Sequence, residues 1–421
     1  MKWVEGWYLS YALLGLSAAG LMPILLPLLV GRTSGAAGIG FVMAAFSLGG
    51  LMAPLWGWLA DHYRLHRWLL TGGLLCTAGG AVVFPCVPIL SGRIVLALLS
   101  GIGLSAASTV ANLFIVEVHP RAEWDTRIGW LQTFYGGGQI VGLLLAGIIG
   151  QAAPERGFWL AGGIAFAAVL PAFLGTGKQT ASLVSPRPVL AHPAHHAEWP
   201  VGSPQHLYHH PSLPALKKFF RSLRSSYSLF LIAWLLSFGG SAAFFSFYPV
   251  LMQAEYGVLP GRSSAAFALA AALGLILYAP AGAWSLRRGP RQVLRYALVL
   301  RIAAFVALTM LAVVSFPGRG WLAMLFFLFV VLAWSLLSVS GTALVASLSP
   351  ENEGEGLGLF NAVTALSGVI GSVLGGWAAN LWGYAAIPIM GMIGVGAGFI
   401  VLSITRFNPR PVFQERKEVH R

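Results

Sequence analysis

Charge and cysteine are both scarce in this sequence. Only 9% of the 421 residues are charged while 57% are hydrophobic, and the mean hydropathy is +0.77. No soluble fold hides that much apolar surface, so the composition predicts a membrane protein. The two cysteines, Cys76 and Cys86, lie on one expected helix. They are roughly 15 Å apart at the rise of an α-helix, which excludes a disulfide between them.

Acidic side chains are missing from the middle of the apolar segments, since none of the 13 Asp and Glu residues lies there. Membrane proteins that bind protons or cations within the bilayer usually bury a carboxylate to do so, which disfavours a cationic ligand. If the chain binds protons, Glu5 and Glu117 are the candidate acids, because they lie at the ends of expected spans. The simpler interpretation is that both mark helix termini. The chain also lacks a nucleophile–base pair, a metal-ligand spacing and a phosphate loop, so we expect neither an enzyme nor a cofactor.

Long apolar runs make up most of the chain. A run of about 18 or more residues nearly free of charge predicts a membrane-spanning helix. Twelve such runs are present: 6–30, 37–60, 68–90, 93–118, 127–150, 157–176, 227–252, 263–286, 293–316, 319–347, 355–381 and 383–405. The first is too long for a signal-peptide core and has no small-residue cleavage site, so we expect it to remain in the protein.

Lysine and arginine lie mainly on one side of the expected membrane. With the N-terminus in the cytoplasm, 20 of the 26 fall on the cytoplasmic side and 5 on the outer side, while Arg301 lies inside a span. This asymmetry follows the positive-inside rule and places both termini in the cytoplasm. The net charge of +13 is therefore explained by topology, and we expect no nucleic-acid partner.

The spans divide into two related halves. Residues 129–147 align without gaps on 358–376, with glycines at three shared positions and Gln132 opposite Asn361. Such a repeat predicts an all-α fold of two pseudo-symmetric six-helix bundles, with a binding site at their interface. The expected parts are a bundle at 1–176, a cytoplasmic central loop at 177–226, a bundle at 227–406 and a cytoplasmic tail at 407–421.

The turn after the second span carries a signature. Residues 57–67, GWLADHYRLHR, resemble the pattern G-x-L-A-D-R-x-G-R-R of the major facilitator superfamily. The matching positions are Gly57, Leu59, Ala60 and Asp61. A partial copy after the eighth span has Leu286 in place of the acid and keeps Gly282, Arg287, Gly289 and Arg291. With the span number, the central loop and the repeat, the chain is identified as a member of this superfamily.

The resemblance implies a conformational latch at these two turns. In the superfamily the acid at the position of Asp61 faces the N-terminus of the eleventh helix and holds the halves together when the transporter opens outward. A helix N-terminus carries about half a positive charge, so that contact is electrostatically favourable. Arg64 belongs to the same turn. The alternative is an ordinary solvated turn that obeys the positive-inside rule.

The fifth span carries a second motif. Residues 138–147 resemble the G-x-x-x-G-P-x-x-G-G signature of the drug/proton antiporter branch, with Leu143 and Ala146 as departures. Small residues at this spacing also serve helix packing in general. The glycines expected to pack helices are Gly138, Gly142, Gly147, Gly371, Gly375 and Gly376.

Polar and aromatic residues share faces of several spans. In the superfamily the first, fourth, seventh and tenth helices line a substrate cavity. A mixture of aromatic walls with a few hydroxyls and amides is typical of small-molecule sites, although Ser and Thr also simply connect membrane helices. The expected cavity residues are Tyr8, Tyr11, Ser105, Ser108, Asn112, Gln132, Gln139, Ser241, Phe245, Tyr248, Trp334, Ser338 and Asn361.

Two further features are less specific. Because the ninth helix of this fold is peripheral, the Arg301 side chain is expected to snorkel to the headgroups.

The central loop repeats H-x-x-H-H at 192–196 and 206–210 among prolines, which favours a linker over a metal site. Residues 215–227 predict an amphipathic helix on the inner leaflet.

Taken with the resemblance, the sequence predicts a secondary transporter of the cytoplasmic membrane that exports a small uncharged or amphipathic compound by alternating access. We expect a monomer among membrane lipids, with protons as the candidate coupling ion. An uptake permease for a sugar-like or other neutral solute is the alternative. A sensor or scaffold of the same fold that does not transport is a rival of another class.

Replacing Asp61 by asparagine tests the expected latch. The variant should transport more slowly and shift toward inward-open states, because the helix end of the eleventh span loses its anionic partner. Substrate binding should persist, since the turn lies outside the expected cavity. Counterflow in liposomes and binding to the purified protein measure the two effects. Full transport by Asp61→Asn would contradict the latch.

Overall fold

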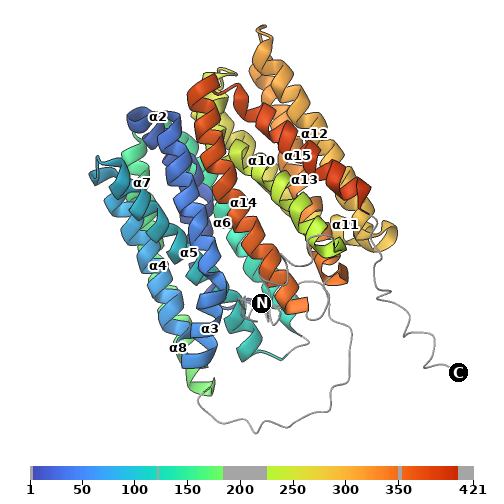
Figure 1. The fold of residues 1–421 in the computed structure, drawn as a ribbon. Coiled ribbons are helices and arrows are strands. Elements are labelled where there is room, and N and C mark those ends of the chain that lie inside the picture. Colours follow the sequence, from blue (N-terminus) through green and yellow to red (C-terminus); the bar gives the residue numbers. More distant parts are fainter. Residues whose placement is uncertain (1–2, 121–122, 184–224, 349–352, 406–421) are drawn as a thin grey trace, which may run out of the picture.

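The computed structural model describes residues 3–120, 123–183, 225–348 and 353–405, except for a few side chains within its helices, that of Asp61 among them. Over these ranges the chain is helical and contains no strand (Figure 1). This confirms the predicted all-α membrane fold. The expected histidine repeat and most of the expected amphipathic helix of the central loop lie outside the described residues.

The first half of the chain forms helices of very different length. Its elements are α1 (Tyr8–Leu14), the π-helix η1 (Gly15–Leu21), α2 (Met22–Leu48), η2 (Gly49–Met52), α3 (Ala53–Tyr63), α4 (His66–Val83), η3 (Phe84–Cys86), α5 (Leu90–Val118), α6 (Trp124–Ala152), α7 (Pro154–Ala167) and α8 (Val169–Leu183). Cys86 ends the 3-10 turn η3, which continues α4 directly, so Cys76 and Cys86 lie on one helical span, His66–Cys86, as predicted. Both thiols are free.

The second half contains six long helices. They are α10 (Ser226–Ala254), α11 (Pro260–Arg288), α12 (Pro290–Val313), α13 (Arg319–Leu348), α14 (Glu353–Trp382) and α15 (Ala386–Ile404). Proline opens α11 and α12, where its missing N–H needs no helical partner. Gly289 lies between them at a φ of 83°, which ends α11 sharply.

The first two spans follow one nearly continuous helical path. Among the described residues 11 helical stretches are long and apolar enough to cross a membrane, and the first, Tyr8–Ala60, has 53 residues. About 20 residues suffice for one crossing. The path turns back at Gly35, whose φ of 65° and ψ of −168° form a conformation open only to glycine. Dividing the stretch there gives twelve crossings, in agreement with the sequence.

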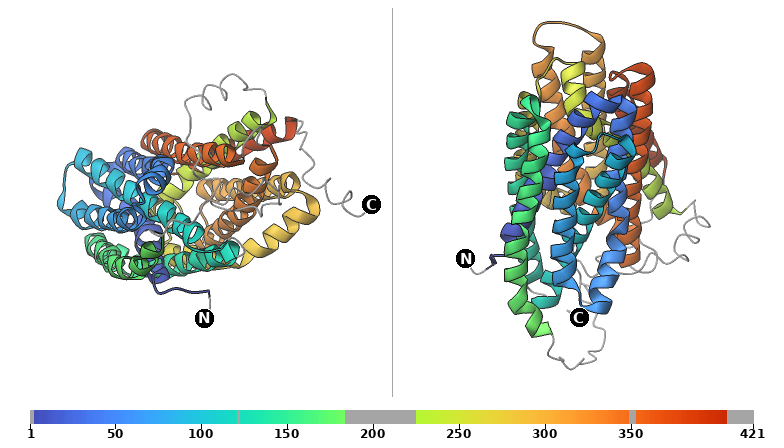
Figure 2. Two further views of the ribbon diagram at one scale, coloured as in Figure 1. Left: turned by 90° about the horizontal axis from the view of Figure 1, so that it is seen from below. Right: turned by 90° about the vertical axis from the view of Figure 1, so that its left-hand side faces the viewer.

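The two halves stand side by side as two groups of helices (Figure 2). They meet where α2 packs on α14 and where α6 packs on α11. These pairs join the second span to the eleventh and the fifth span to the eighth. Each pair is the counterpart of the other under the six-span repeat, so the interface has the pseudo-symmetry that the sequence predicts.

Glycine brings the helices of both pairs close together. A Cβ on Gly376 of α14 would lie 2.9 Å from the Cα of Gly40 on α2. A Cβ on Gly147 of α6 would lie 3.1 Å from the carbonyl oxygen of Gly261 on α11. Both contacts lie toward the end of the molecule where α6 and α14 finish and α11 begins. Glycine thus closes the interface at that end.

Other glycines tighten each half internally. A Cβ on Gly142 would overlap the backbone of Leu16, and one on Gly138 would overlap that of Ala12, so α6 packs directly on α1 and η1. In the second half a Cβ on Gly371 would overlap the carbonyl of Gly239, and one on Gly375 would meet the side chain of Ala243 at 3.1 Å. Close helix approach through small residues is the usual packing in membranes.

The two signature turns are built differently. Arg64 ends α3 in the left-handed conformation, at a φ of 54°. Arg291 donates to the carbonyl oxygens of Leu402 at 3.3 Å and Thr405 at 2.6 Å, which ties α12 to the end of α15. Gly57 lies within α3 and Gly282 within α11, while Arg287 is exposed. The side chain of Asp61 is not described, so the latch stays a prediction.

Replacing Gly376 by leucine should force α14 away from α2. Overpacking of this kind typically costs about 1–3 kcal/mol, which here weakens the closed end of the interface. A cysteine at Ser372, which is fully buried beside this contact, should then react faster with a small maleimide in protein lacking the native cysteines. Gly396→Leu is the matched control, because a Cβ there meets nothing within 4 Å. Equal labelling in both variants would contradict the packing role.

Candidate functional site

A large cavity lies between the two halves. Its volume is about 2560 Å³, and its walls come mainly from α6, α11, α12 and α13, with a smaller part from α10. Toward one end it is bordered by Gly129, Ser285 and Ser347, which lie near the start of α6 and the ends of α11 and α13. The opposite end is closed by the glycine contacts of Gly40 and Gly147. The cavity thus reaches the end where α6 begins, and the glycine contacts close the interface at the other end.

The wall from the first half presents amides. Gln132 and Gln139 of α6 both line the cavity. Gln132 donates to the Oδ1 of Asn112 on α5 at 3.2 Å, and Asn112 donates to the carbonyl oxygen of Ser108 at 2.8 Å. Tyr11 lies behind this chain of bonds, with its ring 4.9 Å from that of Tyr135. The chain of hydrogen bonds fixes Gln132 at the wall.

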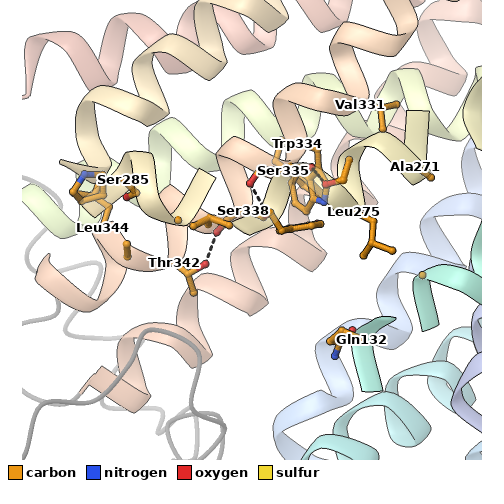
Figure 3. Close-up of a pocket in the computed structure, with 18 of the residues that line it drawn as sticks. Gln132, Ala271, Leu275, Ser285, Val331, Trp334, Ser335, Ser338, Thr342 and Leu344 are labelled. Carbon is orange, nitrogen blue, oxygen red and sulfur yellow. Dashed lines mark hydrogen bonds between the residues drawn. The ribbon is translucent and has the colours of Figure 1, made fainter. Parts of the chain in front are cut away.

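The wall from the second half is mainly aromatic, with a row of hydroxyls. Trp334, Ser335, Ser338 and Thr342 follow one another along α13, across the cavity from Gln132 (Figure 3). The Trp334 ring lies 5.3 Å from that of Phe238. Ser335 donates to the carbonyl oxygen of Gly274 on α11 at 2.9 Å. The hydroxyls of Ser338 and Thr342 bond to carbonyls of their own helix, so their lone pairs remain available to a ligand.

The residues predicted for the cavity fall into two groups. Those that line it are Gln132, Gln139, Phe245, Trp334 and Ser338. Those that lie elsewhere are Tyr8, Tyr11, Ser105, Ser108, Asn112, Ser241, Tyr248 and Asn361. Tyr248 is fully buried, donates to the carbonyl oxygen of Ser263 at 2.7 Å and stacks on Phe327.

The eighth span is a wall that the sequence reasoning missed. Ala271, Gly274, Leu275 and Tyr278 of α11 all line the cavity. Their spacing of three and four residues puts them on one helix face. Because small and apolar residues at that spacing are common on any packed membrane helix, the pattern alone does not separate a cavity wall from a packing face.

Arg301 is placed differently from the prediction. Its side chain does not snorkel but is buried, with 1% of its surface exposed. It donates to the Oγ of Ser241 at 3.2 Å and to the carbonyl oxygen of Val330 at 2.9 Å. Arginine at the centre of a spanning helix costs roughly 2.5–3.5 kcal/mol or more. Snorkelling fails because the side chain points into the bundle, between α10 and α13, instead of toward lipid.

A cluster of charged side chains connects the helices at one end of the first half. Glu5 accepts from Arg127 and lies against His119, at 2.7 Å and 2.8 Å. His66, which is 2% exposed, lies 2.9 Å from Glu117. The interpretation of Glu5 and Glu117 as mere helix ends was therefore incomplete, because each faces a histidine contributed by another part of the bundle. Neither acid lines the cavity.

The charge around the cavity has one sign. Arg288, Arg291 and Arg295 border its open end. No aspartate or glutamate occurs among the residues that line the cavity in the described part of the chain. The field at the opening therefore favours neutral and anionic molecules over cations.

Comparison with known proteins gives a family and several solved structures. The family model described as Major Facilitator Superfamily matches residues 7–353. No curated protein matches the sequence. The nucleoside transporter NupG has a similar structure, with a TM-score of 0.73, 14% identity, and coverage of 94% of this chain and 96% of that one.

Two further solved structures are similar over nearly their whole length. A D-xylose-proton symporter gives a TM-score of 0.64 at 16% identity, covering 94% of this chain and 95% of that one. The human organic anion transporter MFSD10 (TETRAN) gives 0.59 at 18% identity, covering 94% and 98%. At such identities the likeness is one of fold.

Thiol labelling tests the cavity wall directly. In protein without the native cysteines, Gln132→Cys and Ser338→Cys should react with a small maleimide at least about tenfold faster than Ser241→Cys and Tyr248→Cys, because thiol reactions follow access. The slow pair comes from fully buried positions of α10 in the second half. Equal rates for the two pairs would contradict the described cavity.

Proposed function

Because the chain belongs to the Major Facilitator Superfamily, we propose that it is a secondary transporter that exports a small uncharged or amphipathic compound across the cytoplasmic membrane by alternating access. The observation that carries this proposal is the cavity between the halves, which reaches one end of the molecule while glycine contacts close the interface at the other. A binding site at the interface of two repeats is what alternating access requires.

The basic residues at the open end of the cavity indicate which side of the membrane that end faces. Arg288, Arg291 and Arg295 border the opening, and loops rich in lysine and arginine stay in the cytoplasm. The structure then corresponds to an inward-open state. In the outward-open state the contacts of Gly40 with Gly376 and of Gly147 with Gly261 must separate, while the opposite end closes.

The chemistry of the walls supports an amphipathic cargo. Trp334, Phe238 and Phe245 offer aromatic surface, and Gln132 with Ser338 offers a few hydrogen-bonding groups. Apolar walls with a few polar groups can orient a small molecule without requiring that molecule to carry a charge. The named neighbours carry nucleosides, xylose or organic anions, so fold alone does not select among these classes.

Export rests on the fifth-span motif and its packing. Gly138 and Gly142 of α6 pack against α1 and η1, at the positions where the motif resembles that of drug/proton antiporters. For proton coupling, Glu5 and Glu117 are the acids that the geometry favours, because each faces a histidine. Coupling through them would act on the bundle from its end and not through direct contact with cargo.

Counterflow in liposomes tests transport. Purified protein should exchange at least one compound from a panel of drugs, sugars and lipid-like molecules, and Trp334→Ala should slow that exchange by about tenfold, as the loss of a buried aromatic contact implies. Trp377→Ala is the control, because Trp377 is 56% exposed and does not line the cavity.

The direction of transport is measured in cells that maintain a proton gradient. Cells that produce the protein should accumulate less of the exchanged compound than cells without it. Greater accumulation would show an uptake permease. A cavity that labels normally but exchanges no compound of the panel would favour a sensor or scaffold.

A further inference from the structure

Arg301 is a buried cation whose partners are all neutral. Its two hydrogen bonds reach the hydroxyl of Ser241 and the carbonyl of Val330, and its guanidinium lies 5.9 Å from the centre of the Trp334 ring. Its Nε has no hydrogen-bond partner. The guanidinium group has five N–H donors, so more than half of its bonding capacity is unused.

No carboxylate balances this charge in the described part of the chain. The ion pairs there lie at the ends of α1, α4, α5 and α6, in the other half of the molecule, and none includes Arg301. If Arg301 served only to connect neighbouring helices, a neutral amide side chain would do so at lower cost. It would make the same two hydrogen bonds without the free-energy cost of desolvating an ion. The position therefore suits an anion that arrives from outside the protein.

The guanidinium lies directly behind the cavity wall. Its partners Ser241 and Val330 are each followed in the chain by a lining residue, Ala242 and Val331. Trp334 lines the cavity on one side and covers the guanidinium on the other. For a ligand in the cavity to reach the guanidinium, the indole side chain of Trp334 must move aside.

We propose that Arg301 is the anion-binding group of the cavity, and that the cargo is a small organic anion with an apolar or aromatic body and one carboxylate, sulfonate or phosphate. This inference rests on the transport function proposed above and narrows its amphipathic cargo to one sign of charge. The arginine fork binds two oxygens of such a group at once, while Trp334 and Phe245 contact the body. Arg288 and Arg295 at the opening attract the same charge.

Matched pairs of probes test the charge preference. The pairs are naphthalene-2-sulfonate with naphthalene-2-sulfonamide, and indole-3-acetate with indole-3-acetamide. Each is titrated against full-length protein carrying Ser338→Cys in place of the native cysteines, and protection of this thiol from a maleimide is measured. In at least one pair the anion should protect at about tenfold lower concentration than its amide, as a charge-assisted hydrogen bond implies.

Three variants separate binding from structural support. Arg301→Gln should abolish the preference for the anion while keeping donors for Ser241 and Val330, and Arg301→Lys should retain part of it. Arg319→Gln removes an arginine that donates to Ser315 outside the cavity lining, and should leave the preference unchanged. Labelling without probe confirms that each variant keeps its cavity.

The outcomes distinguish this inference from the proposed function. The inference is overturned if an anion and its amide protect equally in both pairs, or if Arg301→Gln keeps the preference for the anion. Arg301 would then have only a structural role, and the cavity would remain a binding site. If no probe of either kind protects Ser338→Cys, the inference is overturned together with the cavity as a site for amphipathic molecules.

Discussion

The close approach of glycine backbones at one end of the molecule is the constraint on which the rest of the structure depends. Gly40 with Gly376 and Gly147 with Gly261 leave no room for side chains between the halves. With that end closed, the remaining length of α6, α11 and α13 borders a cavity that opens the other way. Contacts without side chains can also separate without breaking ion pairs or hydrogen bonds, which suits an interface that must open and close.

The two halves use charge in opposite ways. In the first half, Arg127 and His119 both contact the carboxylate of Glu5 at the ends of the helices, so the largely buried charge of Arg127 has an acidic partner. In the second half, Arg301 is held inside the bundle by neutral groups. The first arrangement stabilises a bundle, whereas the second leaves a charge without an acidic partner in the described structure. The repeat that relates the two folds therefore does not extend to their electrostatics.

Composition and periodicity predicted the membrane fold and several of its helix contacts. Apolar runs indicated the crossings, and the aligned glycines located close helix approaches, because a missing side chain has a direct geometric effect. The cavity was predicted only in part. Gln132 and Trp334 line it, but Tyr248 and Ser241 face the bundle interior, since helical spacing defines a face without showing what that face meets. The burial of Arg301 depends on the rotation of α12, which nothing in the local sequence specifies.

Burying Arg301 also has an electrical consequence. Under the proposed alternating access, this fixed charge lies near the cytoplasmic potential while the cavity faces the cytoplasm, and near the external potential when the carrier faces outward. Reorienting the empty carrier then moves up to one elementary charge through the membrane voltage, worth about 2.3 kcal/mol per 100 mV. A monovalent anion bound at Arg301, as proposed, would cancel that charge. A negative interior would then draw the empty carrier back to face the cytoplasm and leave the movement of the loaded carrier nearly independent of voltage.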